Sequence, residues 1–305
     1  QDLVDAGQMI GPRAFSTGPG IFSQNNFQSK EEAIGLMKRY RDHYRTRNLK
    51  SYIAGNRKQR NYIVQAANEL GMMPTTEGAL DLKLDLTHAI DAFHGNEHNF
   101  PITPLYKDVV ELVAQSGMTY TPTLLVTYGG PWGENFYYAT EEVHDDPKVK
   151  RFVPDNIIQS KTRRVPWFRK DEYAFSKIAK DATKIIRAGG LVGVGGHGQF
   201  NGLGYHWELW SLHSGGMSEM EALRAATING AKIIGVSGDI GSIEYGKLAD
   251  LVILDKDPLV NIRNTNSIRY VMKNGVLYEG DTMNEIWPNP KELDPQWWWN
   301  DGPEN

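Results

Sequence analysis

Apolar residues along the chain recur with two different periods, and the change between periods predicts helices separated by short strands. The stretches with helical spacing are 30–48, 57–70, 82–90, 106–116 and 171–188. The runs with strand character are 11–18, 49–53, 72–77, 120–126 and 191–194. Alternation of this kind is typical of a parallel sheet covered by helices.

The last third of the chain combines a strand, two helices and a second strand in sequence. The strand at 191–194 leads into a glycine-rich turn that carries His197, and a helix follows. Ser218 and Glu221 form a capping-box pattern, which predicts the start of another helix. Beyond that helix the period changes again, and the apolar run 251–254 predicts a buried strand.

This order resembles the C-terminal part of the metal-dependent amidohydrolase superfamily. The segments that carry the resemblance are 217–223, 226–231, 241–247, 249–252 and 269–275. The resemblance implies a (β/α)8 TIM barrel, of which this chain covers strands three to eight, with 11–18 as the third strand. The C-terminal strands of a small β-sandwich domain are expected to follow the barrel.

The expected organisation has three parts. Residues 1–240 form the partial barrel, 241–282 the C-terminal part of the small β-domain, and 283–305 a tail rich in Pro and Trp. Within the barrel, 127–170 is a long insertion rich in aromatic residues, which either covers a pocket as a lid or forms a surface subdomain. The tail either packs on this chain or docks against another domain.

The chain begins with Gln1 rather than Met, and residues 1–7 look like the end of a helix. We therefore expect a piece of a longer protein. Residues 132–135 and 198–210 resemble bacterial proteins in which a β-propeller similar to that of the translocation protein TolB precedes an amidohydrolase domain. This resemblance implies an N-terminal propeller as a partner.

Composition narrows the class of protein. Hydrophobic residues make up 40% and charged residues 23% of the chain, which is ordinary for a globular domain. A net charge of −4 gives no reason to expect nucleic-acid binding. No apolar run approaches the roughly 18 residues of a membrane span, and the absence of cysteine excludes disulfides and cysteine metal ligands. A periplasmic and a cytoplasmic bacterial location both stay open.

The candidate chemistry lies where the strands end, because the C-terminal strand ends of a parallel barrel converge on one pocket. The polar residues expected there are Lys50, Glu77, His98 and His197, with His94 and Tyr128 nearby. Neutral imidazole and carboxylate groups suit zinc and related divalent ions. The strand ends therefore predict a metal site.

The resemblance assigns roles at two of these positions. His98 matches the metal-ligand histidine that ends the sixth strand of the family, the alternative being a structural, hydrogen-bonded histidine. Lys50 matches the fourth-strand lysine that some prolidase-like members carboxylate to bridge two metal ions. The alternative is an unmodified lysine paired with Glu77.

Two further positions depart from the family pattern. Glu77 stands where the fifth strand usually offers a histidine ligand, and glutamate can still bind a metal ion. His197 stands where the eighth strand usually offers an aspartate that binds metal and takes a proton from water. As a neutral imidazole, His197 can serve as ligand or proton acceptor, or it has only a structural, helix-capping role.

The resemblance implies a hydrolase that cleaves an amide, peptide or cyclic amide bond with metal-activated water, in the imidazolonepropionase- and prolidase-like branch. One or two ions of zinc or another divalent metal are expected, with His206, Tyr128 and His94 as contacts of a small-molecule or peptide substrate. The family's paired ligands are absent, since no His-x-His occurs in the 305 residues. A catalytically silent binding or assembly module therefore remains an alternative, as does a site completed by another chain. An open barrel also exposes strand edges, which favours a homo-oligomer.

Overall fold

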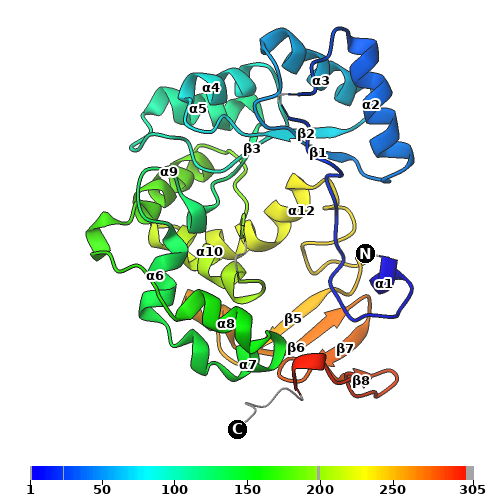
Figure 1. Ribbon diagram of the computed structural model, residues 1–305, viewed down its shortest axis with the longest axis vertical. Coiled ribbons are helices and arrows are strands. Elements are labelled where there is room, and N and C mark those ends of the chain that lie inside the picture. Colours follow the sequence, from blue (N-terminus) through cyan, green and yellow to red (C-terminus); the bar gives the residue numbers. More distant parts are fainter. Residues whose placement is uncertain (1, 23, 198–199, 300–305) are drawn as a thin grey trace.

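The computed structural model describes residues 2–22, 24–197 and 200–299. Two separate four-stranded sheets organise these residues. The parallel sheet with its helices forms the upper part of Figure 1, and the antiparallel sheet lies at the lower end. Across the described residues, no helix combines the length and the apolar character needed to cross a membrane.

The parallel sheet is the partial barrel that the sequence predicts. Its strands, in spatial as well as chain order, are β1 (Asn48–Lys50), β2 (Met73–Thr76), β3 (Gly95–Glu97) and β4 (Thr119–Thr121). Isolated parallel bridges extend it at both edges, from Ile21 to Ser51 and from Tyr120 to Val192. Six chain segments therefore lie side by side in chain order, as expected for strands three to eight.

Apart from the short first helix, which precedes the first barrel segment at Ile21, helices follow the strands and cover the outside of the sheet. They are α1 (Asp2–Asp5), α2 (Lys30–Asp42), α3 (Arg57–Glu69), α4 (Leu82–Ile90), α5 (Lys107–Ser116), α9 (Phe175–Arg187), α10 (Leu203–Ser214), α11 (Glu219–Arg224) and α12 (Gly230–Ile233), with a π-helical stretch, η4 (Ala225–Asn229), between the last two. Side chains of Ser29, Asn56, Asp81 and Ser218 accept backbone N–H bonds at four of the helix starts. These caps explain why the sequence pattern located the helix starts closely.

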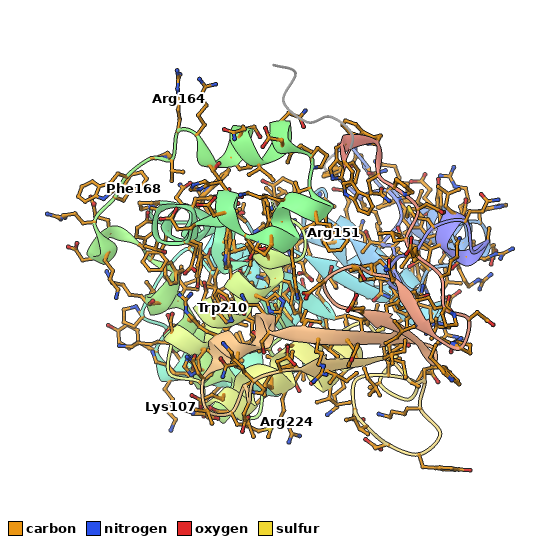
Figure 2. The ribbon with its side chains drawn as sticks, turned by 90° about the horizontal axis from the view of Figure 1, so that it is seen from below. Lys107, Arg151, Arg164, Phe168, Trp210 and Arg224 are labelled. Carbon is orange, nitrogen blue, oxygen red and sulfur yellow. The ribbon has the colours of Figure 1, made fainter. Side chains whose placement is uncertain are left out.

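The inserted segment 127–170 folds into short helices that pack on α10. They are α6 (Gly133–Thr140), η2 (Val143–Asp145), α7 (Pro147–Phe152) and α8 (Asp155–Thr162), and η3 (Lys170–Glu172) follows. The ring of Tyr137 stacks on buried Trp207 with centroids 5.1 Å apart. Figure 2 shows Trp210 inside the fold, whereas Arg164 points away from it. The insertion thus shares the core of α5, α9 and α10.

The antiparallel sheet contains β5 (Leu251–Leu254), β6 (Ile268–Lys273), β7 (Val276–Glu279) and β8 (Glu285–Trp287), in that order, with η5 (Ile262–Asn266) between β5 and β6. The expected burial of 251–254 is wrong for its centre, since Val252 is 59% exposed. The reason is its place in the edge strand.

In the tail, η6 (Trp297–Trp299) contacts α7, where the Nε1 atoms of Trp298 and Trp299 donate to the Arg151 carbonyl. Residues 300–305 of the tail lie outside the described residues.

The strand predicted at 11–18 is wrong. Its segment contains Pro12 and no strand pairing, and it runs between the two sheets. Arg13 forms an ion pair with Asp250 at 3.2 Å, and Lys273 Nζ donates to the Gly11 carbonyl at 2.6 Å. These contacts draw the segment to the antiparallel sheet, and the barrel pairing falls later, at Ile21.

The strand predicted at 120–126 ends early, at Thr121. Pro122 has no N–H for a ladder, and Thr123 adopts a left-handed φ of 54°, so the chain turns into η1 (Leu124–Val126). Glu208 on α10 holds this turn, accepting the N–H groups of Leu124 at 2.7 Å and Leu125 at 3.0 Å. Complete burial raises the pKa of Glu208 to about 8.

Candidate functional site

Three side chains meet at the C-terminal ends of β1, β2 and β3. Lys50 Nζ donates to Glu77 Oε2 at 2.6 Å, and His98 Nε2 lies 3.3 Å from the same oxygen. Their side chains are 29%, 11% and 16% exposed respectively. We call Lys50, Glu77 and His98 the strand-end cluster. It joins three predicted site residues from three parallel strands, as the convergence of barrel strand ends requires.

The backbone around His98 is held in an unusual conformation. His98 has a left-handed φ of 64°, which a bulky residue rarely adopts. Asn96 Nδ2 donates to the Glu97 and His98 carbonyls at 3.3 and 3.4 Å. Asn99 Oδ1 accepts the Tyr128 N–H at 2.8 Å. Two asparagines therefore fix the turn that aims the imidazole at Glu77.

His197 and Tyr128 complete the surroundings of His98. The His197 ring centroid is 5.5 Å and the Tyr128 ring centroid 5.9 Å from that of His98. His197 follows the short segment of Val192, which pairs with β4, and it is exposed. The structure thus brings five of the seven predicted site residues together.

Burial controls the charge of these groups. The pKa of His98 lies below its usual value, first because of burial and then because of the positive charge of Lys50 and the His197 ring, against the opposing effect of Glu77. Burial, reinforced by Glu77, raises the pKa of Tyr128 to about 12. At neutral pH the site therefore presents a neutral imidazole and a protonated phenol.

The two remaining predicted residues lie elsewhere. His94 precedes β3, at the strand end opposite to His98, and its Nε2 lies 2.9 Å from the Ile233 carbonyl. His206 Nδ1 lies 3.1 Å from Thr265 Oγ1 beside the Trp210 ring, and burial lowers its pKa to about 4. Neither is joined to the strand-end cluster by a hydrogen bond or ring contact among the described residues.

The sequence analysis gave no role to Glu97 or to Asn99. Glu97 accepts a hydrogen bond from Thr121 Oγ1. Burial raises its pKa, although this Thr121 bond and the charge of Lys50 act in the opposite direction. The signal available in the sequence was the polar run 96–99, which covers the end of β3 and the two residues after it.

Two donors of the strand-end cluster, His98 Nε2 and Glu77 Oε2, have the spacing of two ligands of one divalent metal ion. Two ligand atoms of a tetrahedral zinc ion, each about 2.0–2.2 Å from the metal, lie roughly 3.3–3.5 Å apart. His98 Nε2 and Glu77 Oε2 are 3.3 Å apart, and His98 Nδ1 is buried without a hydrogen-bond partner among the described residues. The Lys50 ammonium contacts the same glutamate oxygen and so competes with a metal ion for it. Carboxylation of Lys50 would replace this ammonium with an oxygen ligand.

A second group of metal-binding side chain types lies on the surface, at η2. In the described part of the chain, ligand atoms of Glu142, His144 and Asp145 all lie within 4.8 Å of one another. All three residues are exposed, and Asp145 already accepts a bond from Lys150 at 3.1 Å. We call these three residues the surface group.

The fold and the strand-end residues define a class, the (β/α)8-barrel proteins in which polar side chains gather at the C-terminal strand ends. A family model described as the Amidohydrolase family matches residues 60–278, more than half of the chain. The chain therefore belongs to the amidohydrolase family.

Curated relatives match over short stretches. The imidazolonepropionase of Symbiobacterium thermophilum is 59% identical over 39 residues, 13% of this chain and 9% of that protein. The imidazolonepropionase of Clostridium tetani is 32% identical over 115 residues, 36% of this chain and 26% of that protein. The 5-methylthioadenosine/S-adenosylhomocysteine deaminase of Thermoanaerobacter pseudethanolicus is 60% identical over 38 residues, 12% and 9% of the two chains. The matched stretches span well under two thirds of these relatives.

Solved structures match over nearly the whole chain. A Xaa-Pro dipeptidase with bound methionine has a TM-score of 0.65 and 22% identity, covering 92% of this chain and 71% of that one. A putative prolidase from Bifidobacterium longum has a TM-score of 0.62 and 20% identity, with coverages of 96% and 70%. At these identities the likeness shows the fold, and it confirms the predicted amidohydrolase barrel.

Proposed function

We propose that the strand-end cluster is the metal-binding centre of a hydrolase that cleaves the C–N bond of an amide, peptide or cyclic amide. The observation that carries the proposal is the 3.3 Å separation of His98 Nε2 and Glu77 Oε2 at the ends of adjacent parallel strands. Membership of the amidohydrolase family supports it.

In this proposal His98 and Glu77 hold zinc or a similar divalent ion, and carboxylated Lys50 adds an oxygen ligand. A bound ion of this kind supplies an activated water and polarises the scissile carbonyl. The lowered pKa of His98 keeps its imidazole neutral, the form that binds metal.

The exposed His197 imidazole takes the proton released at the site and returns it to the leaving nitrogen. Its exposure lets substrate approach, and its ring lies beside His98. Tyr128 keeps its phenol proton up to about pH 12 and donates a hydrogen bond to the substrate. A small cyclic amide or a Xaa-Pro peptide is the proposed substrate class, supported by the imidazolonepropionase relatives and the dipeptidase fold.

A second function, a non-catalytic binding module, is favoured by one observation. The Lys50 ammonium lies 2.6 Å from Glu77 Oε2, and an ammonium there neutralises the carboxylate and opposes a cation. A strand-end cluster with unmodified Lys50 would therefore bind polar ligands without hydrolysing them.

The test is an assay of the purified chain loaded with zinc in the presence of bicarbonate, which supplies the carbon dioxide for lysine carboxylation. Substrates are a panel of Xaa-Pro dipeptides and a cyclic imidazolone. Zinc-dependent hydrolysis that His98→Ala abolishes and His144→Ala preserves is the expected result. Zinc binding without turnover of any amide would favour the binding module, and failure to bind zinc would contradict the metal centre.

A further inference from the structure

The connection between β2 and α4 begins with buried Glu77 and Gly78, but its last residues are exposed. Leu80 is 72% exposed, and Ala79 has a left-handed φ of 53°. Asp81 caps α4, accepting the Leu84 N–H at 3.2 Å. A turn with an exposed apolar residue and a strained alanine needs an anchor elsewhere if Glu77 is to hold one orientation.

Asp85, on α4, supplies that anchor from the core. Asp85 is 1% exposed, and its Oδ1 accepts the Gly78 N–H at 2.9 Å. The approach is so close that a Cβ on Gly78 would lie 2.2 Å from Asp85 Oδ1. Its other oxygen, Oδ2, is buried without a hydrogen-bond partner among the described residues. A buried carboxyl with one backbone partner is costly to the fold, which favours a role beyond packing.

The hydrogen bond acts on Glu77 through the peptide plane. The Gly78 N–H belongs to the rigid peptide that follows the Glu77 Cα, so holding it sets the ψ angle of Glu77. The φ angle of Glu77, which continues β2, and its side-chain torsions then remain, and its Oε2 is held by Lys50 and faces His98.

We propose that Asp85 is a positioning residue that sets the orientation of Glu77 toward Lys50 and His98 by holding the Gly78 N–H. The inference rests on the proposed function only in taking Glu77 as a site residue. Burial raises the pKa of Asp85 to about 7, helped by the nearby charges of Asp81 and Glu77 and opposed by the Gly78 bond. A proton on the unpartnered Oδ2 reduces the cost of burial and leaves Oδ1 free to accept.

The test compares Asp85→Ala with Asp85→Asn. Asparagine keeps an Oδ1 acceptor for Gly78, and alanine does not. In crystal structures of the metal-free variants, we expect the Lys50–Glu77 contact to be lost in Asp85→Ala and kept in Asp85→Asn. Zinc affinity of the purified chain should fall about 10- to 100-fold in Asp85→Ala, the range typical of groups that orient a metal ligand, and stay close to wild type in Asp85→Asn.

Asp181→Ala is the matched control. Asp181 lies on α9, outside the strand-end cluster, and is 2% exposed. Its Oδ1 accepts the Leu105 N–H at 3.0 Å. Its loss should destabilise the chain without changing zinc affinity. If Asp85→Ala does not fold, Gly78→Ala separates the same two groups by adding a methyl between them.

An unchanged Glu77 orientation in Asp85→Ala or Gly78→Ala would overturn the positioning role, as would a loss of zinc affinity in Asp181→Ala equal to that in Asp85→Ala. A wild-type chain that takes up no zinc would instead overturn the proposed function. The position of Glu77 in the metal-free structures would still decide the role of Asp85.

Discussion

The strand-end cluster and the surface group contain the same kinds of metal-binding side chains in very different settings. Glu142, His144 and Asp145 have side-chain exposures of 82%, 51% and 65% and belong to one short turn. Glu77 and His98 are 11% and 16% exposed and come from two strands of one sheet. Close ligand atoms alone therefore do not define a site. A site also needs rigid elements that exclude water and hold the ligand side chains in place.

The causes of the pKa shifts differ in the same way. A hydrogen bond from Lys150 lowers the pKa of the exposed Asp145 carboxyl, and a lysine contacts Glu77 in the strand-end cluster as well, so pairing with a cation does not separate the two groups. Burial lowers the pKa of His98, so its imidazole stays neutral and available. We infer that a metal ion would choose the strand-end cluster over the surface group.

The largest expected effect comes from Glu77→Ala. This change removes the oxygen that both Lys50 and His98 contact and leaves the lysine without its partner. We predict loss of zinc and of hydrolysis below detection, measured by elemental analysis and the amide assay. The matched change Glu142→Ala should alter neither. A Glu77→Ala protein that keeps zinc would place the metal elsewhere.

His197→Ala should separate chemistry from metal binding. If His197 transfers the proton, kcat should fall by about 10²–10⁴, with zinc content retained because Glu77 and His98 remain. Steady-state kinetics and metal analysis of the same preparation check this. Loss of zinc together with activity would instead make His197 a ligand.

Glu208 tests the effect of burial on a carboxyl in the core. Its folded pKa of about 8 lies above its ordinary value of 4.5, so the folded chain binds more protons than the unfolded chain between these values. Stability contributed by this proton should therefore fall as pH rises from 4.5 to 8, by at most about 1.4 kcal/mol per pH unit.

Urea unfolding of the wild type and Glu208→Gln across this pH range measures the effect. The difference in unfolding free energy, wild type minus variant, should decrease with rising pH. A difference that stays constant or increases would contradict a raised pKa of Glu208 in the folded chain.

The smallest expected effect is that of His144→Ala. His144 is half exposed and its neighbours are the exposed Glu142 and Asp145. Surface ion pairs of this kind contribute little, so we predict an unchanged urea midpoint and unchanged activity. A large change in the urea midpoint or in the activity would indicate that the surface group is a functional site.

The sequence pattern predicted the helices outside 127–170. It also predicted the meeting of Lys50, Glu77, His98, His197 and Tyr128, because strand ends in a parallel barrel converge whatever the loops do. The sequence pattern failed at 11–18, because the path of this segment depends on contacts of Arg13 with Asp250 and of Gly11 with Lys273. These partners are remote in sequence.

The errors at single residues have similar causes. His94 and His98 are four residues apart but lie at opposite ends of β3, since the strand is only three residues long. The role of Asp85 was not predicted, because a helical pattern does not show that a carboxylate points inward and accepts the Gly78 N–H. The lid role of 127–170, the N-terminal propeller and the oligomeric state stay predictions.

The most direct test of the metal centre is the zinc content of the purified wild type, His98→Ala and His144→Ala, measured by elemental mass spectrometry after equal exposure to zinc. We predict bound zinc in the wild type and in His144→Ala, and none in His98→Ala. Zinc retained by His98→Ala, or lost from His144→Ala, would contradict the assignment of the metal to the ends of β2 and β3.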